Sequence, residues 1–222
     1  MNPAPQPWSW TEPARPPFAP LAPNIPATVW CAPVPPPSDP LRTELAALLS
    51  PEEHIRLARL RQPADQLRFL TGRALIRRLL GAHLHRPPAS LGLHIGPSGK
   101  PFITLPPETP PLHFNLSHSG DFVLVAFSET HEVGIDIERI DSSTDCSAIA
   151  AGIFPLAIHS AWLNTPPKDR LNVFYQLWTR HEARIKALGH GFAREPDASA
   201  LATLRCFDLQ LPPGYTGALA LA

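Results

Sequence analysis

The sequence predicts an α+β fold, in which hairpins and helices are interspersed rather than alternating as in a doubly wound sheet. Short β-branched and aromatic runs flank a tight turn within residues 114–127, as in a β-hairpin. Residues 64–83 and 169–188 form the two long helical stretches, the first with leucines on one broad face. Because a strand, helices and further strands occur in that order twice, we expect two similar halves.

The N-terminal part reads as a tail followed by a strand and helices. Prolines dominate residues 2–26, and because proline fixes φ and lacks an amide donor, we expect a disordered tail. A strand is predicted at 27–30. The run Ser50-Pro51-Glu52-Glu53 combines a cap residue, a proline at the first helical position and a glutamate three residues after the cap, which indicates a helix start. The longer helix at 64–83 is stopped by Pro87-Pro88.

The C-terminal part continues with hairpins and one long helix. Residues 96–101 have the composition of a turn, and Ser119-Gly120-Asp121 closes the hairpin. We expect a strand at 133–140, a helix at 169–188 ended by Gly189, and closing strands at 205–211 and 217–222. The predicted division is a tail over 1–26, an N-terminal half over 27–132 and a C-terminal half over 133–222.

Composition limits the class of partner and compartment. Nineteen basic and nineteen acidic residues give a formal net charge of zero, so charge does not point to nucleic acid or an anionic membrane. Three well-separated cysteines form neither a disulfide framework nor a zinc-ligand pattern. The chain has no apolar run of about 18 residues and no secretory signal pattern. We therefore expect a cytoplasmic protein that acts without nucleic acid or a membrane.

Two acidic residues on the predicted strand 133–140 suit a metal ion. Asp136 and Glu138 are two apart, so their side chains point to the same face. Adjacent carboxylates repel each other unless a cation lies between them, and carboxylate oxygens together with phosphate and water suit Mg²⁺. An exposed polar face on an edge strand is the alternative interpretation of this pair alone.

Three further groups are candidates for binding or catalysis. Glu182 and Lys186 share a helix face at i,i+4, where a surface ion pair is the simpler alternative. Ser117 and His118 precede the hairpin turn, where hydroxyls and an imidazole suit a phosphate, although turn geometry alone explains the serine equally well. Eight arginines between residues 56 and 86 offer guanidinium forks for phosphate, and most of them fit a solvated helix face.

Taken together and in order, three segments resemble the surfactin-type 4′-phosphopantetheinyl transferases. They are FNLSHSGDFVLVAF, GIDIE and FYQLWTRHEARIKALGHGF, and the resemblance runs from about Val29 to the C-terminus. It implies the 4′-phosphopantetheinyl transferase fold, with two α/β halves forming a pseudo-dimer in one chain. It also implies transfer of the phosphopantetheine arm of coenzyme A to a serine of an apo acyl or peptidyl carrier protein by a monomeric, Mg²⁺-dependent enzyme.

The resemblance also implies roles for single residues. Asp136, Glu138 and Glu182 match the Mg²⁺ carboxylates; Glu182 also matches the base that takes the serine proton, and Lys186 the residue that neutralises the pyrophosphate. The expected coenzyme-binding residues are Arg56 and Arg68 at the 3′-phosphate, Lys100 beside the adenine and its ribose phosphate, Ser117 and His118 at the phosphates, and His181.

Two residues depart from the family pattern. His181 replaces a usual lysine, and Glu53 stands where relatives often carry a basic residue, so both are expected to weaken coenzyme binding. They support an alternative, a weakened homologue that binds coenzyme A or a carrier without transfer. A metal-dependent phosphohydrolase built on the three carboxylates is a further alternative. Residues 141–163 are expected to receive the carrier, with apolar candidates Ile149, Ile153, Phe154 and Ile158.

Overall fold

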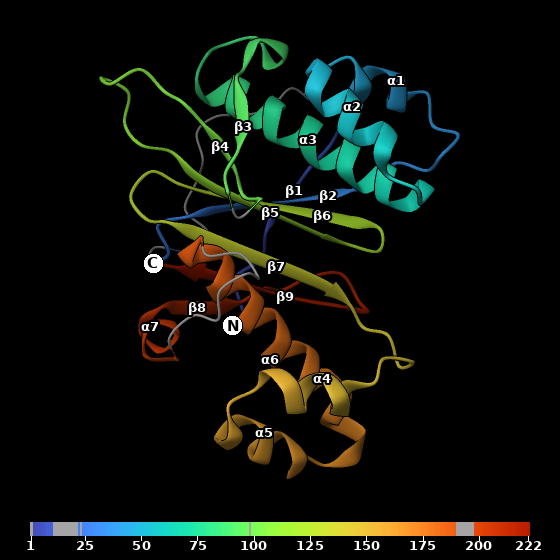
Figure 1. Cartoon of the computed structure of the whole chain (residues 1–222), viewed down its shortest axis with the longest axis vertical. Helices are drawn as coiled ribbons and strands as arrows, with labels where there is room; N and C mark the ends of the chain where they lie inside the picture. Colours follow the sequence, from blue (N-terminus) through green and yellow to red (C-terminus); the bar gives the residue numbers. More distant parts are fainter. Residues whose placement is uncertain (1, 11–21, 23, 98, 190–197) are drawn as a thin grey trace.

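The computed structural model describes residues 2–10, 22, 24–97, 99–189 and 198–222. Two sheets lie next to each other at the centre, with α1–α3 at one end of the molecule and α4–α6 at the other (Figure 1). The N-terminal elements are β1 (Gln6–Pro7), β2 (Thr28–Pro33), α1 (Leu41–Ala46), α2 (Pro51–Arg59), α3 (Pro63–His83), a 3₁₀ turn (Pro88–Ser90), β3 (Leu93–Ile95), β4 (Pro101–Ile103), β5 (His113–Ser119) and β6 (Phe122–Ser128). The C-terminal elements are β7 (Val133–Arg139), α4 (Cys146–Ile153), α5 (Leu156–Leu163), α6 (Pro167–Leu188), α7 (Ala198–Thr203), β8 (Arg205–Asp208) and β9 (Tyr215–Leu221).

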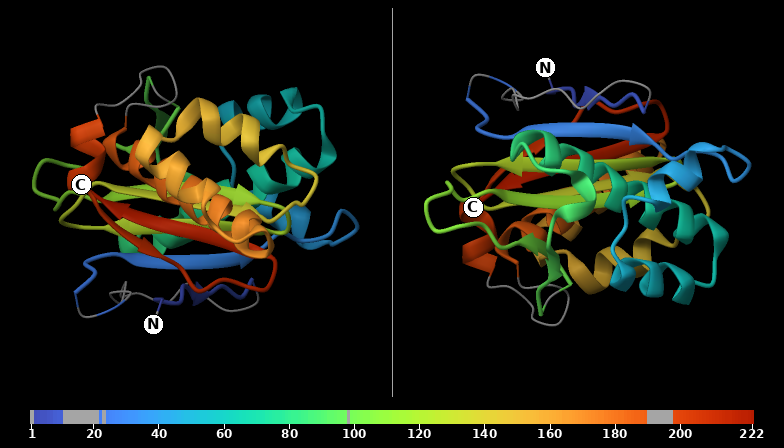
Figure 2. Two further views of the ribbon diagram at one scale, coloured as in Figure 1. Left: turned by 90° about the horizontal axis from the view of Figure 1, so that it is seen from below. Right: turned by 90° about the horizontal axis from the view of Figure 1, so that it is seen from above.

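The two halves have the same strand order. In the first sheet β2 pairs antiparallel with β6, the last strand of its half, and β6 pairs antiparallel with β5. In the second sheet β7, β9 and β8 follow the same rule. Along the chain, helices α1–α3 come between β2 and β5, and helices α4–α7 come between β7 and β8. In each half one long helix, α3 or α6, packs on the sheet (Figure 2). The predicted α+β fold with two similar halves is confirmed.

The long helix of the C-terminal half approaches its sheet very closely at Gly134. A Cβ atom at this glycine would lie 2.0 Å from the backbone oxygen of Ala183 and 2.2 Å from the backbone nitrogen of Ala187. Glycine therefore lets the α6 backbone touch β7. Gly189 ends α6 in the left-handed region at φ 69°, as the sequence predicts for a glycine that follows the last helical residue.

The N-terminal residues that the structure describes differ from the predicted tail. Gln6 and Pro7 pair parallel to β2, and the Trp8 side chain is buried in the apolar cluster between α3 and the first sheet. In this segment the structure therefore has a short paired strand and a buried tryptophan where the sequence predicted a disordered tail. The physical reason is that proline is tolerated on an edge strand, and the neighbouring tryptophan buries a large apolar surface. Residues 1, 11–21 and 23 of the predicted tail lie outside the described residues.

The two sheets meet along β5 and β7 through side chains of β5. The Asn115 Oδ1 atom accepts the Ile135 N–H at 2.9 Å, the Ser117 Oγ atom accepts the Ile137 N–H at 3.4 Å, and the Ser119 Oγ atom accepts the Arg139 N–H at 3.1 Å. These three side chains are spaced two apart and so lie on one face of β5. We call this row of contacts the seam between the halves. The predicted division at residue 133 falls at the first residue of β7.

The described helices do not include one that is long and apolar enough to cross a membrane.

Candidate active site

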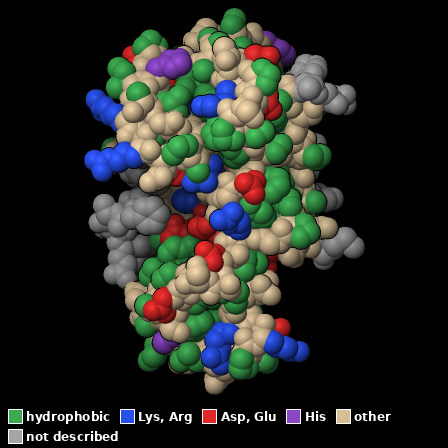
Figure 3. Space-filling view, turned by 90° about the vertical axis from the view of Figure 1, so that its right-hand side faces the viewer, with side chains coloured by type: hydrophobic (Ala, Val, Ile, Leu, Met, Phe, Trp, Pro, Cys, Tyr) green, Lys and Arg blue, Asp and Glu red, His purple; other side chains and the backbone are tan. Residues whose placement is uncertain are grey.

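Several of the acidic and basic residues that the sequence singles out line one cavity beside the seam. We call it the carboxylate cavity. In Figure 3, acidic and basic side chains gather around a hollow midway along one face of the molecule. Strand β5, strand β7 and helix α6 line the cavity with Leu116, Ser117, His118, Asp136, Glu138, Trp178, Glu182 and Lys186.

Asp136 is the most buried acid of this cavity, with 2% of its surface exposed. Its Oδ1 atom accepts a hydrogen bond from the Lys186 ammonium at 2.6 Å and one from the Ser117 hydroxyl at 2.8 Å. The Lys186 ammonium also donates to the Ser117 Oγ atom at 3.2 Å. The Oδ2 atom is buried without a hydrogen-bond partner among the described residues. A buried carboxylate oxygen of this kind is costly unless a cation or donor satisfies it.

Glu138 is held in place by a hydroxyl on the opposite side of the seam. The Ser119 Oγ atom donates to the Glu138 Oε2 atom at 2.8 Å. Burial raises the pKa of Glu138, and the negative charge of Asp136 raises it further, while hydrogen bonds from Ser119 and the Trp178 side chain and the charge of Lys186 oppose the rise. The net direction is upward, so this carboxylate would be stabilised by additional positive charge.

Among the three acids of the cavity, Glu182 has the carboxyl group with the largest pKa shift. Burial raises the pKa of Glu182 to about 7; the Lys186 ammonium opposes this, and the charges of Asp136 and Glu138 add to it. A carboxyl group with a pKa near neutrality can accept a proton at physiological pH and release it again. Burial is the largest cause of this rise, and the charges of the two other carboxylates contribute less.

Glu182→Gln is expected to stabilise the metal-free protein at pH 8. Because the folded-state pKa lies above the ordinary value of 4.5, the folded protein binds this proton more tightly than the unfolded chain. The stability that the proton contributes is present at low pH and is lost as the pH rises from about 4.5 to about 7, on the order of 3 kcal/mol in total. Melting temperatures measured in chelator should therefore be similar at pH 5 and higher for the variant at pH 8. Glu129→Gln, which changes an exposed carboxylate, is the control. The same change of melting temperature with pH in the wild type and in Glu182→Gln would contradict the raised pKa of Glu182.

The donor set fits a divalent cation, although no ligand cluster is ready-made. The three carboxylates line one cavity, Asp136 Oδ2 is unsatisfied, and oxygen ligands are those that Mg²⁺ prefers. Within the described ranges, however, no three His, Cys, Asp or Glu side chains are grouped closely enough to hold an ion. The ammonium of Lys186 instead neutralises Asp136. A cation at this place would therefore need a rearrangement of these side chains or ligands from a substrate.

A second cavity adjoins the first and is lined by several cationic side chains. We call it the basic cavity. It shares Leu116, His118 and Lys186 with the carboxylate cavity, and its described lining contains no acidic residue. The Phe69 ring faces two guanidinium groups, with its centroid 5.6 Å from Arg56 Cζ and 5.3 Å from Arg73 Cζ. The full lining is Arg56, Phe69, Arg73, Gly99, Lys100, Pro101, Asn115, Leu116, His118, Ile185, Lys186 and Gly189.

Arg73 is a candidate that the sequence did not single out among the eight arginines of its region. Only 4% of it is exposed, and its Nε and Nη1 atoms have no hydrogen-bond partner among the described residues. The nearest acid is Glu53, whose Oε1 atom lies 3.8 Å from Arg73 Nε. Burial lowers the pKa of Arg73, Glu53 raises it, and Arg56 and Arg77 lower it. The available signal was its i,i+4 spacing from Phe69, which places both on one helix face.

Glu53 has a structural role rather than a place in the cavity. It completes the capping box of α2 with Ser50, and its Oε2 atom accepts a hydrogen bond at 2.8 Å from the Nε atom of fully buried Arg77. Glu53 is 8% exposed and does not line the basic cavity, but its Oε1 atom lies 3.8 Å from Arg73 Nε, so its expected effect on coenzyme binding stays a prediction.

The remaining predicted residues are placed as follows. Arg68 donates to Asp65 Oδ1 at 2.6 Å and to the Gly120 oxygen at 3.3 Å, and it lines neither cavity. Burial is the largest cause that lowers the pKa of His118, and the charge of Arg68 lowers it further. His181 is half-buried on α6 and is also absent from both linings.

The predicted carrier-binding residues separate into two groups. Ile149, Ile153 and Phe154 pack against the apolar cluster of α4–α6, so they belong to the core. Ile158 is 41% exposed on α5, where Leu156 is 81% exposed. The exposed apolar surface of this region therefore lies on α5 rather than on α4.

Comparison with known proteins covers both halves. Residues 36–130 match the family model described as 4′-phosphopantetheinyl transferase, N-terminal, and residues 132–215 match that of the 4′-phosphopantetheinyl transferase superfamily. The chain is 31% identical over 189 residues to the 4′-phosphopantetheinyl transferase HetI of Nostoc, which covers 85% of this chain and 79% of that protein. It is 31% identical over 154 residues to a 4′-phosphopantetheinyl transferase of Bacillus subtilis (69% and 66% covered) and 38% identical over 122 residues to AcpT of Escherichia coli (55% and 57% covered).

Proposed function

The chain belongs to the 4′-phosphopantetheinyl transferase superfamily, and from this premise we propose that it transfers the phosphopantetheine group of coenzyme A to a serine of an apo carrier protein. One observation supports this proposal above the others. A cavity with three interacting carboxylates and Lys186 opens beside a cavity lined by cations, which suits a substrate with a diphosphate and a further phosphate. The narrower surfactin-type assignment stays a prediction.

The residues that would hold Mg²⁺ are Asp136, Glu138 and Glu182. Their support is the donor chemistry, the unsatisfied Asp136 Oδ2 atom and the upward pKa shifts of both glutamates. When bound, the ion would neutralise charge on the diphosphate of the coenzyme. Lys186 would then be free to turn its ammonium from Asp136 toward the leaving group.

The chain's own residues can carry the proton and charge changes of the transfer. The serine oxygen of the carrier forms a bond to the β-phosphorus, and the bond from that phosphorus to the bridging oxygen breaks. The electron pair leaves with 3′,5′-ADP, whose new charge Lys186 stabilises. The serine proton is proposed to pass to Glu182, a carboxylate that lines the same cavity as Lys186.

The basic cavity would bind the nucleotide part of the coenzyme. Arg56 and Arg73 are proposed at the 3′-phosphate, because both guanidinium groups flank Phe69 and Arg73 has unsatisfied donors. His118 and Ser117 lie where the two cavities adjoin, which suits contacts to the diphosphate. Exposed apolar residues of α5 are proposed to receive the carrier, and we expect a cytoplasmic monomer.

Arg73→Met is expected to raise the Kd for coenzyme A about tenfold or more, since a charge-assisted pair with phosphate is lost. The same change should have little effect on 3′-dephospho-coenzyme A, which lacks that phosphate. Isothermal titration calorimetry of both ligands measures the difference. Arg59→Met, which removes an exposed arginine of α2 outside both cavities, is the matched control. An equal loss for both ligands would refute a specific phosphate contact.

A mass measurement tests the proposed function itself. The protein is incubated with Mg²⁺, coenzyme A and an apo carrier protein, and the carrier is then weighed. A gain equal to one phosphopantetheine group supports the transferase. Binding of the carrier or coenzyme without a mass gain would support the weakened homologue instead, and release of inorganic phosphate without a carrier would support the phosphohydrolase.

A further inference from the structure

The hairpin of β3 and β4 forms part of the wall of the basic cavity, and its Leu93 and Ile103 side chains pack against the apolar cluster of the first half. Among the described strands these two pair only with each other. The hairpin tip is closed by hydrogen bonds from the Gly96 N–H to the Lys100 oxygen and from the Gly99 N–H to the Gly96 oxygen, both 2.9 Å. Gly99, Lys100 and Pro101 from this tip line the basic cavity. Whatever holds the tip therefore shapes the cavity.

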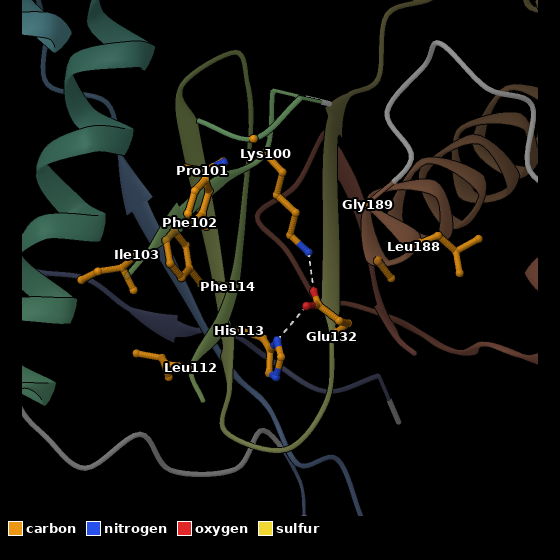
Figure 4. A pocket seen from close by; sticks show the side chains of 12 residues that line it. Lys100, Pro101, Phe102, Ile103, Leu112, His113, Phe114, Glu132, Leu188 and Gly189 are labelled. Atoms are coloured by element: carbon orange, nitrogen blue, oxygen red, sulfur yellow. Dashed lines mark hydrogen bonds and ion pairs between the residues drawn. The ribbon is translucent and has the colours of Figure 1, made fainter. Parts of the chain in front are cut away.

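An ion pair ties this tip to the other half of the molecule. The Lys100 ammonium donates to the Glu132 Oε2 atom at 2.8 Å (Figure 4). It also donates to the Val133 oxygen at 3.1 Å. Val133 is the first residue of β7, so the contact joins the hairpin to the strand that carries Asp136 and Glu138. The Lys100 side chain is 18% exposed and that of Glu132 is 50% exposed.

His113 completes the arrangement from the first residue of β5. Its Nδ1 atom lies 2.8 Å from the Glu132 Oε1 atom, so each oxygen of Glu132 has a partner (Figure 4). Burial raises the pKa of Glu132, but hydrogen bonds and charge from Lys100 and His113 outweigh it, and the net pKa is lowered. The carboxylate is thus charged at neutral pH and neutralises the ammonium of Lys100.

We propose that Glu132 is a positioning residue, which holds Lys100 and the hairpin tip in place so that the wall of the basic cavity is formed before the coenzyme binds. Lys100 then contributes to coenzyme binding through the position of this wall and not as the counter-charge of a phosphate. This inference rests on the proposed function, because it takes coenzyme A as the ligand of the basic cavity. It differs from the role that the family resemblance implies for Lys100.

The two roles of Lys100 predict opposite signs for Glu132→Gln. If Glu132 positions the wall, its loss raises the Kd for coenzyme A by about two- to fivefold, which lies within the range for a partly exposed ion pair. The Kd for 3′-dephospho-coenzyme A should rise by the same factor. If Glu132 merely competes with a phosphate for Lys100, the variant should bind coenzyme A more tightly and leave the dephospho form unchanged. Tighter or unchanged binding would overturn the proposal.

Exchanging the charges of Lys100 and Glu132 provides a second test of the positioning role. Lys100→Glu alone should weaken binding of both ligands, and Lys100→Glu combined with Glu132→Lys should recover much of that loss, because an ion pair is restored in the reverse sense. A double variant no better than Lys100→Glu would contradict the positioning role. Glu129→Gln, which neutralises another exposed carboxylate of the same β6–β7 connection, is the control.

Hydrogen exchange tests the inference without coenzyme binding or transfer. In the free protein, Glu132→Gln should speed exchange at the Gly96 and Gly99 amides several-fold, while amides in the centre of β6 keep their rates. Unchanged exchange at the two glycines would refute the positioning role. If the wild-type protein bound no coenzyme but the two amides behaved as expected, the proposed function would fail and the attachment of the hairpin by Glu132 would stand.

Discussion

Glu138→Ala is expected to reduce phosphopantetheine transfer by about a thousandfold while the protein stays folded. Glu138 lines one cavity together with Asp136 and Glu182, and its removal takes away one of the three proposed metal-binding carboxylates. The pKa of Glu138 is raised by burial and by Asp136, so the folded state does not depend on its charge. Mass-spectrometric initial rates and circular dichroism measure the two effects.

Two variants sharpen this test. Glu129→Ala removes a carboxylate outside both cavities and should keep the wild-type rate. Glu138→Gln keeps the shape and the hydrogen bond with Ser119 but not the charge, and should be nearly as slow as Glu138→Ala. Full transfer by either Glu138 variant would mean that this carboxylate holds no essential cation.

Gly134→Ala is expected to destabilise the protein by about 3–5 kcal/mol, or to prevent its accumulation in folded form. The added Cβ would meet backbone atoms of Ala183 and Ala187, which cannot move without shifting α6 as a whole. Since α6 carries Glu182 and Lys186, any folded fraction should also transfer slowly. Thermal and denaturant unfolding measure the loss of stability.

Gly152→Ala is the matched control for this prediction. Gly152 lies in α4, and a Cβ atom there would meet no other atom within 4 Å. Because alanine favours a helix over glycine by roughly 1 kcal/mol, this variant should be as stable as the wild type or slightly more so. A melting temperature for Gly134→Ala close to that of Gly152→Ala would contradict the close approach of α6 and β7.

The elements that the sequence predicted well have local causes. The helix start at Ser50 follows from the cap residue, the proline and Glu53, and the structure has that capping box. The hairpin around Gly120 and the end of α6 at Gly189 follow from residues that accept a positive φ. The strand with Asp136 and Glu138 was evident from its alternation, and the structure places both in the predicted strand.

The features that sequence reasoning missed depend on contacts between distant segments. In the sequence Arg73 looks like its neighbouring arginines, and its burial beside Phe69 and Glu53 becomes evident only in the folded structure. Lys100 and Glu132 are 32 residues apart, and no local pattern marks them as a pair. The Trp8 side chain lies in a proline-rich run, so its burial beside β2 could not be inferred from composition.

The two halves have the same strand order but contribute different charged side chains. Strands β2 and β7 occupy equivalent places in their halves, yet β7 carries Asp136 and Glu138, whereas β2, TVWCAP, has no acid at all. The two halves thus share a strand order but differ in the charged side chains that they contribute. The C-terminal half provides the three carboxylates, the N-terminal half provides Arg56 and Arg73, and the two adjoining cavities therefore have no symmetry-related second pair among the described residues.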